Sequence, residues 1–207
     1  MPGACGAVSG AIHARPLDDL VAEAVDFHGH LCPGVVLGVR MALAGCRELG
    51  LDDPRGARKS LVIFVEIDRC ATDAIQALTG VSLGKRTLKH VDLGRMAATF
   101  ADVPGGRAVR VVALDEARDR AVALVPGESD RRRAQAVAYL TMPEASLLAI
   151  EPVRIRPGWL DRRRVRVACA SCGEGVCYGR EVEVAGRALC RACAGETYYD
   201  VAGTGRV

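Results

Sequence analysis

Four cysteines near the C-terminus constrain this chain more than any other feature. They form two Cys-x2-Cys pairs, separated by seventeen residues, at Cys169, Cys172, Cys190 and Cys193. Each pair makes a tight turn that points two thiolates the same way, and a hairpin between the pairs brings the second turn round to the first. Four thiolates around one ion form the closed, tetrahedral site typical of structural zinc. The spacing therefore predicts a zinc-binding module over residues 165–199, with Cys177 as a spare thiol inside it.

The cysteine content also bears on the compartment. The chain has nine cysteines, and residues 1–16 lack the basic start and apolar core of a signal peptide. We therefore expect a cytoplasmic protein that keeps its thiols reduced for metal. The longest apolar stretch, residues 34–45, contains Arg40 and is too short to cross a bilayer, so no membrane association is expected.

Two arginine runs, residues 131–133 and 162–164, raise the question of nucleic-acid binding. Aromatic residues make up only 4% of the chain, which leaves few rings on which bases could stack. Because charge runs are common on ordinary surfaces, we interpret both runs as solvated and expect no nucleic-acid partner.

Residue patterning divides the rest of the chain into helices and strands. Apolar periodicity predicts helices over 17–27 and 35–49, a short helix capped by Thr72 or Asp73 and ending at Leu78, and a helix over 129–140. β-branched and apolar runs predict strands at 60–67, 88–91, 96–100, 108–114 and 147–155. The predicted organisation is a flexible N-terminus (1–16), a main domain (17–156), a linker (157–164), the zinc module (165–199) and a tail (200–207).

The segment His28-Gly29-His30-Leu31-Cys32 is the second candidate for metal chemistry. In an extended segment side chains alternate, so His28, His30 and Cys32 would share one face. Imidazoles and thiolates are good ligands for zinc and similar transition metals. Cys32 precedes a predicted helix, whose N-terminus lowers the pKa of a thiol.

Cys70 follows the strand predicted at 60–67 and precedes another helix, so its thiol has the same local setting as that of Cys32. The sequence leaves open whether the two cysteines meet, and a His-x-His pair with a buried cysteine also occurs without metal. If they meet, the four side chains offer up to four ligands, whereas an open catalytic site would use three.

Together these motifs resemble the FmdE (FwdE) family, which is named for one of the subunits of formylmethanofuran dehydrogenase. The resemblance rests on FHGHLCPG at 27–34, on DAIQ at 73–76 and on CASCGEGV at 169–176. It implies an α+β fold, with helices packed on a mixed sheet and a zinc-ribbon or treble-clef-like module at the C-terminus, and it implies a homodimer. It places a metal site on His28, His30, Cys32 and Cys70, and a pocket on Asp73, Gln76 and Lys85.

Three functions follow as hypotheses. The first is a metal-binding accessory protein of a molybdenum or tungsten oxidoreductase or of its metal supply. The alternative is a stand-alone metalloenzyme, with Cys32, Lys85 or Asp73 as catalytic candidates and Gln76 and Lys85 as substrate-binding candidates. The third is a regulatory zinc-ribbon module. A concave pocket beside the metal would favour the enzyme, and an exposed site with a partner surface would favour the accessory protein.

Overall fold

The computed structural model describes residues 11–57, 59–161, 164–200 and 202. Residues 1–10 of the predicted flexible N-terminus, residues 162–163 of the predicted linker, and residues 201 and 203–207 of the predicted tail lie outside the described residues. The chain divides into two compact units, residues 1–155 and 156–207.

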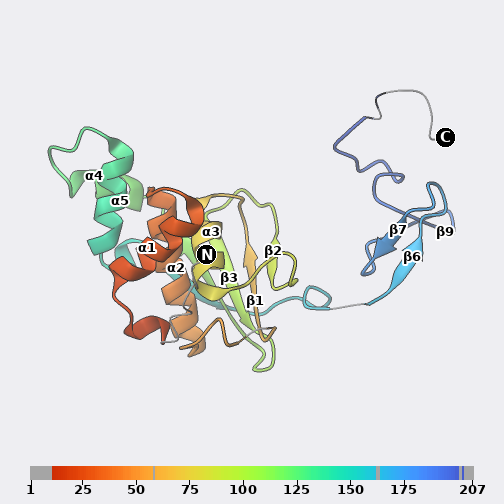
Figure 1. The fold of residues 1–207 in the computed structure, drawn as a ribbon, viewed down its shortest axis with the longest axis horizontal. Coiled ribbons are helices and arrows are strands. Elements are labelled where there is room, and N and C mark those ends of the chain that lie inside the picture. Colours follow the sequence, from red (N-terminus) through yellow and green to blue (C-terminus); the bar gives the residue numbers. More distant parts are fainter. Residues whose placement is uncertain (1–10, 58, 162–163, 201, 203–207) are drawn as a thin grey trace, which may run out of the picture. The chain divides into compact units, whose positions relative to one another are not determined.

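The first unit is a mixed five-stranded sheet with helices packed on it (Figure 1). The strand order is β2-β1-β3-β4-β5; β1 and β2 run parallel, and the other neighbours run antiparallel. The strands are β1 (Leu61–Val65), β2 (Leu88–His90), β3 (Ala97–Asp102), β4 (Arg107–Ala113) and β5 (Leu148–Val153). The predicted α+β class with helices on a mixed sheet is confirmed.

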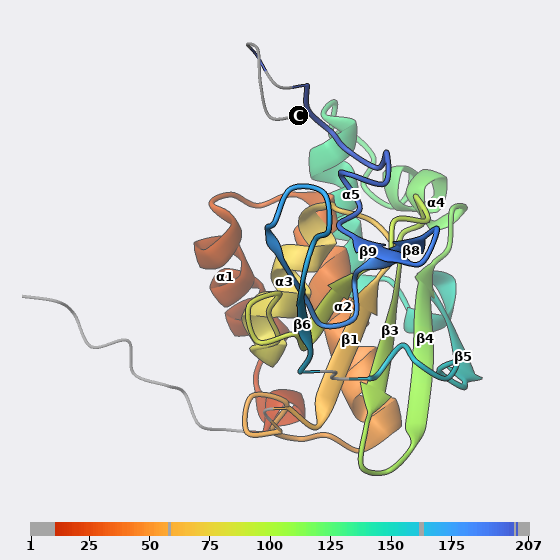
Figure 2. The same cartoon turned by 90° about the vertical axis from the view of Figure 1, so that its right-hand side faces the viewer.

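Helix α2 (Pro33–Leu49) is the centre of the helical layer. It packs on β3 and β4, and α1 (Leu17–His28), α3 (Cys70–Thr79) and α5 (Arg131–Thr141) pack against it (Figure 2). The remaining helices are α4 (Ala117–Ala123), which packs on α5, and the short η1 (Ile12–Ala14) and η2 (Glu144–Ser146). Because an apolar stripe lines α2 and all five residues of β1 are buried, the core lies between this helix and the sheet.

Two small residues let α2 approach its neighbours closely. A Cβ atom added to Gly38 would lie 2.5 Å from the carbonyl oxygen of Ala71 in α3, and one added to Gly45 would overlap the Phe100 ring. Glycine therefore lets α2 approach the backbone of α3 at Gly38, and the Phe100 ring at Gly45, more closely than a side chain would permit. This close packing brings the N-termini of α2 and α3 together.

One local prediction was wrong, one helix was missed, and part of the predicted flexible N-terminus is packed. Ile12 is 3% exposed and its N–H donates to the carbonyl of Asp52. Helix α3 begins at Cys70, with Arg69 at its N-cap, rather than after Thr72 or Asp73. Helix α4 was not predicted at all.

The second unit consists of two hairpins, β6 (Arg166–Ala168) with β7 (Gly175–Cys177) and β8 (Val182–Val184) with β9 (Arg187–Leu189). The first cysteine pair lies in the turn between β6 and β7, and the second follows β9. Among the described residues, no helix has both the length and the apolar character needed to cross a membrane.

Candidate metal centre and adjoining pocket

Three of the predicted ligands meet where three helix ends converge. His28 is the last residue of α1, Cys32 is the N-cap of α2, and Cys70 is the first residue of α3. The potential ligand atoms of these three side chains all lie within 4.8 Å of one another. The two cysteines that the sequence could only place in similar local settings therefore do meet.

A contact with Asp73 orients the His28 ring. Its Nδ1 lies 2.7 Å from the Asp73 carboxylate, while its Nε2 lies 3.9 Å from the Cys32 sulfur. A histidine that ligates a metal through one nitrogen usually donates from the other to a carboxylate or carbonyl, which fixes the tautomer. Typical zinc–nitrogen and zinc–sulfur bonds would hold two tetrahedral ligands roughly 3.6 Å apart. The donor set and its spacing therefore fit a transition metal.

His30 does not belong to this group of ligand atoms. Its side chain is exposed and its ring lies 4.6 Å from the ring of His28, centre to centre. The predicted shared face assumed an extended segment, but α1 continues to His28 and ends at Gly29, whose φ of 99° reverses the chain. The alternation of side chains therefore does not apply across this segment.

The pKa of the Cys70 thiol is raised. Burial raises it most and the neighbouring Cys32 thiol raises it further, and together they outweigh the lowering by a backbone N–H group and by Arg69. The backbone at the start of α3 therefore does not leave Cys70 with a lowered pKa, contrary to the expectation.

The three residues that the resemblance placed in a pocket have different surroundings. Asp73 contacts His28 as described, and its side chain is partly exposed. Lys85 donates to the carbonyl of Gly80, beyond the C-terminal end of α3, whereas Cys70 begins that helix. Gln76 lies one turn after Asp73, and neither Gln76 nor Lys85 lines the cavity described next.

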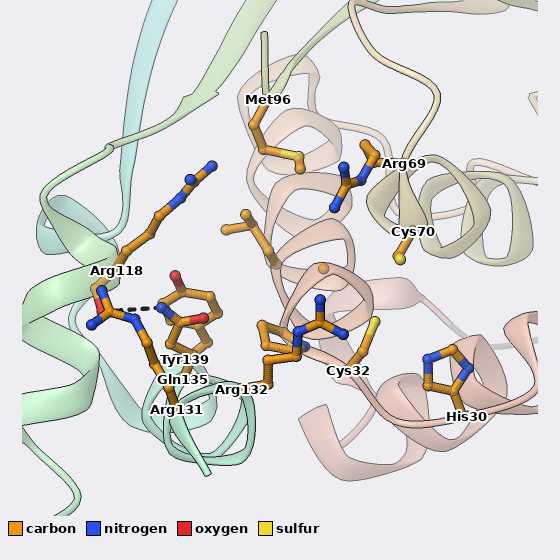
Figure 3. Close-up of a pocket in the computed structure, with 13 residues that line it drawn as sticks. His30, Cys32, Arg69, Cys70, Met96, Arg118, Arg131, Arg132, Gln135 and Tyr139 are labelled. Atoms are coloured by element: carbon orange, nitrogen blue, oxygen red, sulfur yellow. Dashed lines mark hydrogen bonds between the residues drawn. The ribbon is translucent and has the colours of Figure 1, made fainter. Parts of the chain in front are cut away.

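A cavity of about 440 Å³ adjoins the metal-ligating group. Cys32 and Cys70 both point into it (Figure 3). Its opposite wall comes from α4 and α5, through Arg118, Arg131, Gln135 and Tyr139. Arg69, Arg132 and Met96 also line the cavity, and so does His30, the predicted ligand that lies outside the ligand group.

The α5 wall is held in place by Arg40 of α2. Its guanidinium donates to the carbonyl of Tyr139 at 2.8 Å and to that of Met142 at 2.9 Å, which satisfies free carbonyls at the end of α5. Residues 131–133 are exposed, as the sequence predicted, but the sequence did not indicate that Arg131 and Arg132 also line a cavity. Only the contact between α5 and α2 gives these residues a place beside the cysteines.

The second candidate centre is the four-cysteine group of the C-terminal unit. The sulfurs of Cys169, Cys172, Cys190 and Cys193 all lie within 4.8 Å of one another. The N–H of Cys190 donates to the Cys169 sulfur at 3.2 Å, and backbone N–H groups lower the pKa of Cys169 to about 6. Cys177 lies in β7, outside this group. The predicted quartet is thus assembled as a closed set of metal ligands.

Comparisons with known proteins agree with this architecture. A family model described as "FmdE, Molybdenum formylmethanofuran dehydrogenase operon" matches residues 27–149. A protein of Archaeoglobus fulgidus named "Probable S-adenosyl-L-methionine-binding protein" is 30% identical over 216 residues, which cover 92% of this chain but only 56% of that relative. The chain thus spans about half the length of this relative.

A solved structure has a similar fold. It is a tungsten formylmethanofuran dehydrogenase FmdE-like protein from Syntrophus aciditrophicus, with a TM-score of 0.62 and 24% identity. The match covers 91% of this chain and 97% of that one.

Proposed function

Because this chain belongs to the FmdE family, we propose that it is a metal-binding protein with a reactive centre and a structural one. His28, Cys32 and Cys70 would hold a transition metal at the reactive centre. The four cysteines of the C-terminal unit would hold structural zinc, whose closed thiolate set leaves no position for a substrate.

The orientation of His28 is the observation that carries the proposal. Its Nδ1 contacts Asp73 and its Nε2 faces Cys32, which is the orientation that a ligating imidazole needs. Three protein ligands leave a fourth position for water or a substrate. When bound, such a metal supplies Lewis-acid activation of an oxygen-bearing group.

The adjoining cavity favours the enzyme hypothesis over the accessory one. Cys32 and Cys70 are partly buried and line a cavity of about 440 Å³, which is large enough for a small molecule. In this arrangement Asp73 is a positioning residue, because it acts through His28, and Cys32 is a ligand rather than a free nucleophile. Lys85 lies beyond the C-terminal end of α3, whereas Cys70 begins that helix, so Lys85 is not assigned either role.

Association with a molybdenum or tungsten oxidoreductase is the second candidate. It is supported by the description of the family and by the name of the solved structure. Co-purification of the tagged protein from its own cells tests it: a stable molybdenum or tungsten partner would support the accessory role.

S-adenosylmethionine is the ligand suggested by the name of the Archaeoglobus relative. This molecule carries a sulfonium and an ammonium cation against one carboxylate. The cavity of this chain is lined by four arginines and, among the described residues, by no aspartate or glutamate. Net repulsion therefore disfavours it as the ligand of this cavity.

Two further proposals concern assembly and location. A homodimer is supported by the exposed apolar side chains of Phe27 and Leu31, which are 51% and 53% exposed beside the metal-ligating group. Sedimentation analysis of the parent and of Leu31→Ser tests it. A cytoplasmic location is supported by the thiol-rich ligand sets, which need reducing conditions.

The metal content of untagged protein purified without oxygen tests the main proposal. We expect about two metal ions per chain in the parent and about one in Cys32→Ala. Cys46→Ala is the matched control, because Cys46 is a buried thiol of α2 outside both ligand groups, and it should keep both ions. Equal metal content in the parent and in folded Cys32→Ala would overturn the proposal.

A further inference from the structure

We propose that the cavity beside Cys32 and Cys70 binds a small anionic molecule, with its acid group held by Arg69 and Arg132. This inference rests on the proposed function, because it names the ligand class for the same centre. The family description and the relatives' names say nothing of such a ligand.

The charge of the lining is one-sided. Arg69, Arg118, Arg131 and Arg132 all line the cavity, and the described residues contribute no carboxylate to it. These guanidinium groups repel one another, although solvent screens part of the repulsion, because the side chains of Arg118 and Arg131 are 59% and 62% exposed. An anionic ligand would relieve this repulsion and gain charge-assisted hydrogen bonds.

Two of the four arginines already have partners. Arg131 pairs with Asp119, and Arg118 approaches Asp115 at 3.9 Å. Among the described residues, the side chains of Arg69 and Arg132 make no hydrogen bond or ion pair. These two guanidiniums are therefore the ones available to a ligand.

Arg69 and Arg132 line the same cavity from different helices, so a single ligand could contact both. Arg69 comes from the N-cap of α3 and acts on the neighbouring Cys70 thiol. Arg132 comes from the first turn of α5 and points across the cavity toward Cys32 (Figure 3). The N-termini of α2 and α3 also line this cavity and add positive potential, whereas the N-terminus of α5 is capped by the Asp130 carboxylate.

The rest of the lining indicates an organic acid or organic phosphate. Leu37, Met96 and Tyr139 give the cavity an apolar side. Carboxylates and phosphoryl groups both match the fork of a guanidinium, so they share the recognition chemistry proposed here. With the acid group on Arg69 and Arg132, that group would lie beside the two cysteines, and the apolar part of the ligand would face Leu37, Met96 and Tyr139.

Calorimetric titration tests the inference with two probes, inorganic phosphate and malonate. Saturable binding of either probe to the parent is expected, and the tighter probe shows whether the natural ligand is phosphoryl-bearing or carboxylate-bearing. Arg69→Gln and Arg132→Gln should each weaken the dissociation constant at least tenfold, because each removes charge-assisted bonds.

Arg133→Gln is the matched control, because Arg133 follows Arg132 in α5 but pairs with Glu128 and does not line the cavity. Its binding should stay within about twofold of the parent. Equal weakening in this control, or no binding of either probe to the parent, would overturn the inference.

The two proposals fail separately. The arginine variants should keep both metal ions, and the parent stripped of the reactive-centre metal should still bind the anion. If the reactive-centre metal is missing from the parent but the anion still binds, only the metal centre is refuted. Intact metal content with no anion binding would refute only the anion site.

Discussion

Replacing Gly34 with alanine tests whether the packing of α2 on α3 sets the geometry of the metal centre. Gly34 lies in the first turn of α2, two residues after Cys32. A Cβ atom at this position would lie 2.9 Å from the Cβ of Cys70 and 3.6 Å from its sulfur. An ordinary contact needs at least 3.4 Å, so Cys70 must move by about 0.5 Å.

This substitution should lower stability slightly and metal affinity strongly. Alanine gains about 1 kcal/mol of helix propensity over glycine, while the clash costs about 1–3 kcal/mol, so stability should fall by at most about 2 kcal/mol. Metal sites tolerate only about 0.2 Å of error in ligand distance. The shift of Cys70 exceeds this tolerance, and we expect at least a tenfold loss of metal affinity.

Competition with a metal-binding dye measures this loss, and urea unfolding measures stability. Gly84→Ala is the control, because a Cβ there meets nothing within 4 Å and the backbone needs no positive φ. If Gly34→Ala binds the metal of the reactive centre with the parent's affinity, the contact between α2 and α3 does not set the position of Cys70. That result would refute the argument.

Three further predictions use other contacts. Glu66 is 6% exposed and accepts two hydrogen bonds from Arg110, at 2.7 and 2.9 Å, which hold its pKa below the usual 4.5. The stabilisation by this carboxylate is therefore complete above pH 4.5 and is lost as pH falls through the lowered pKa. In urea unfolding, Glu66→Gln should cost about 2–3 kcal/mol at pH 7 and less at pH 3. An equal cost at both pH values would contradict this. Gly38→Ala should cost about 2–3 kcal/mol in the same assay, because the added Cβ meets the backbone of Ala71, and a cost below about 0.5 kcal/mol would contradict the packing argument. Cys172→Ser should remove about one metal ion per chain and leave the reactive centre loaded, which metal analysis with Cys177→Ser as control can check.

Most of the fold follows from local patterns in the sequence. The apolar run of β1 is buried at every position, as a continuous β-branched segment predicts. Helix α2 begins at Pro33 and ends before Gly50, which adopts the left-handed conformation typical of a helix end. The cysteine quartet is likewise a local motif, because each pair needs only a turn and a neighbouring hairpin.

The errors at the candidate site concern residues whose local sequence is compatible with two different conformations. The segment from His28 to Cys32 was expected to be extended, but Gly29 ends α1, so His28 is helical. Thr72 and Asp73 are good capping residues, yet α3 starts earlier, because Ala71 packs against Gly38 within the helix pair. In both cases tertiary packing decided between alternatives that the local sequence allowed.

The arginine wall could not be predicted from any local pattern. Arg132 is 62 residues beyond Cys70, and its run looks like a solvated helix face. It faces the cavity only because Arg40 bonds the end of α5 to α2. Such a contact, between residues about a hundred positions apart, leaves no periodic trace in a single sequence.

The positive potential of the cavity has two physical sources, and only one of them can be removed by substitution. Arg69 and Arg132 contribute full charges, whereas the N-termini of α2 and α3 contribute partial charges through backbone N–H groups. The same helix ends that bring Cys32 and Cys70 together therefore also favour an anion beside them. For this reason a variant that lacks both guanidiniums should bind phosphate weakly rather than not at all, and its remaining affinity measures the combined contribution of the backbone, Arg118 and Arg131.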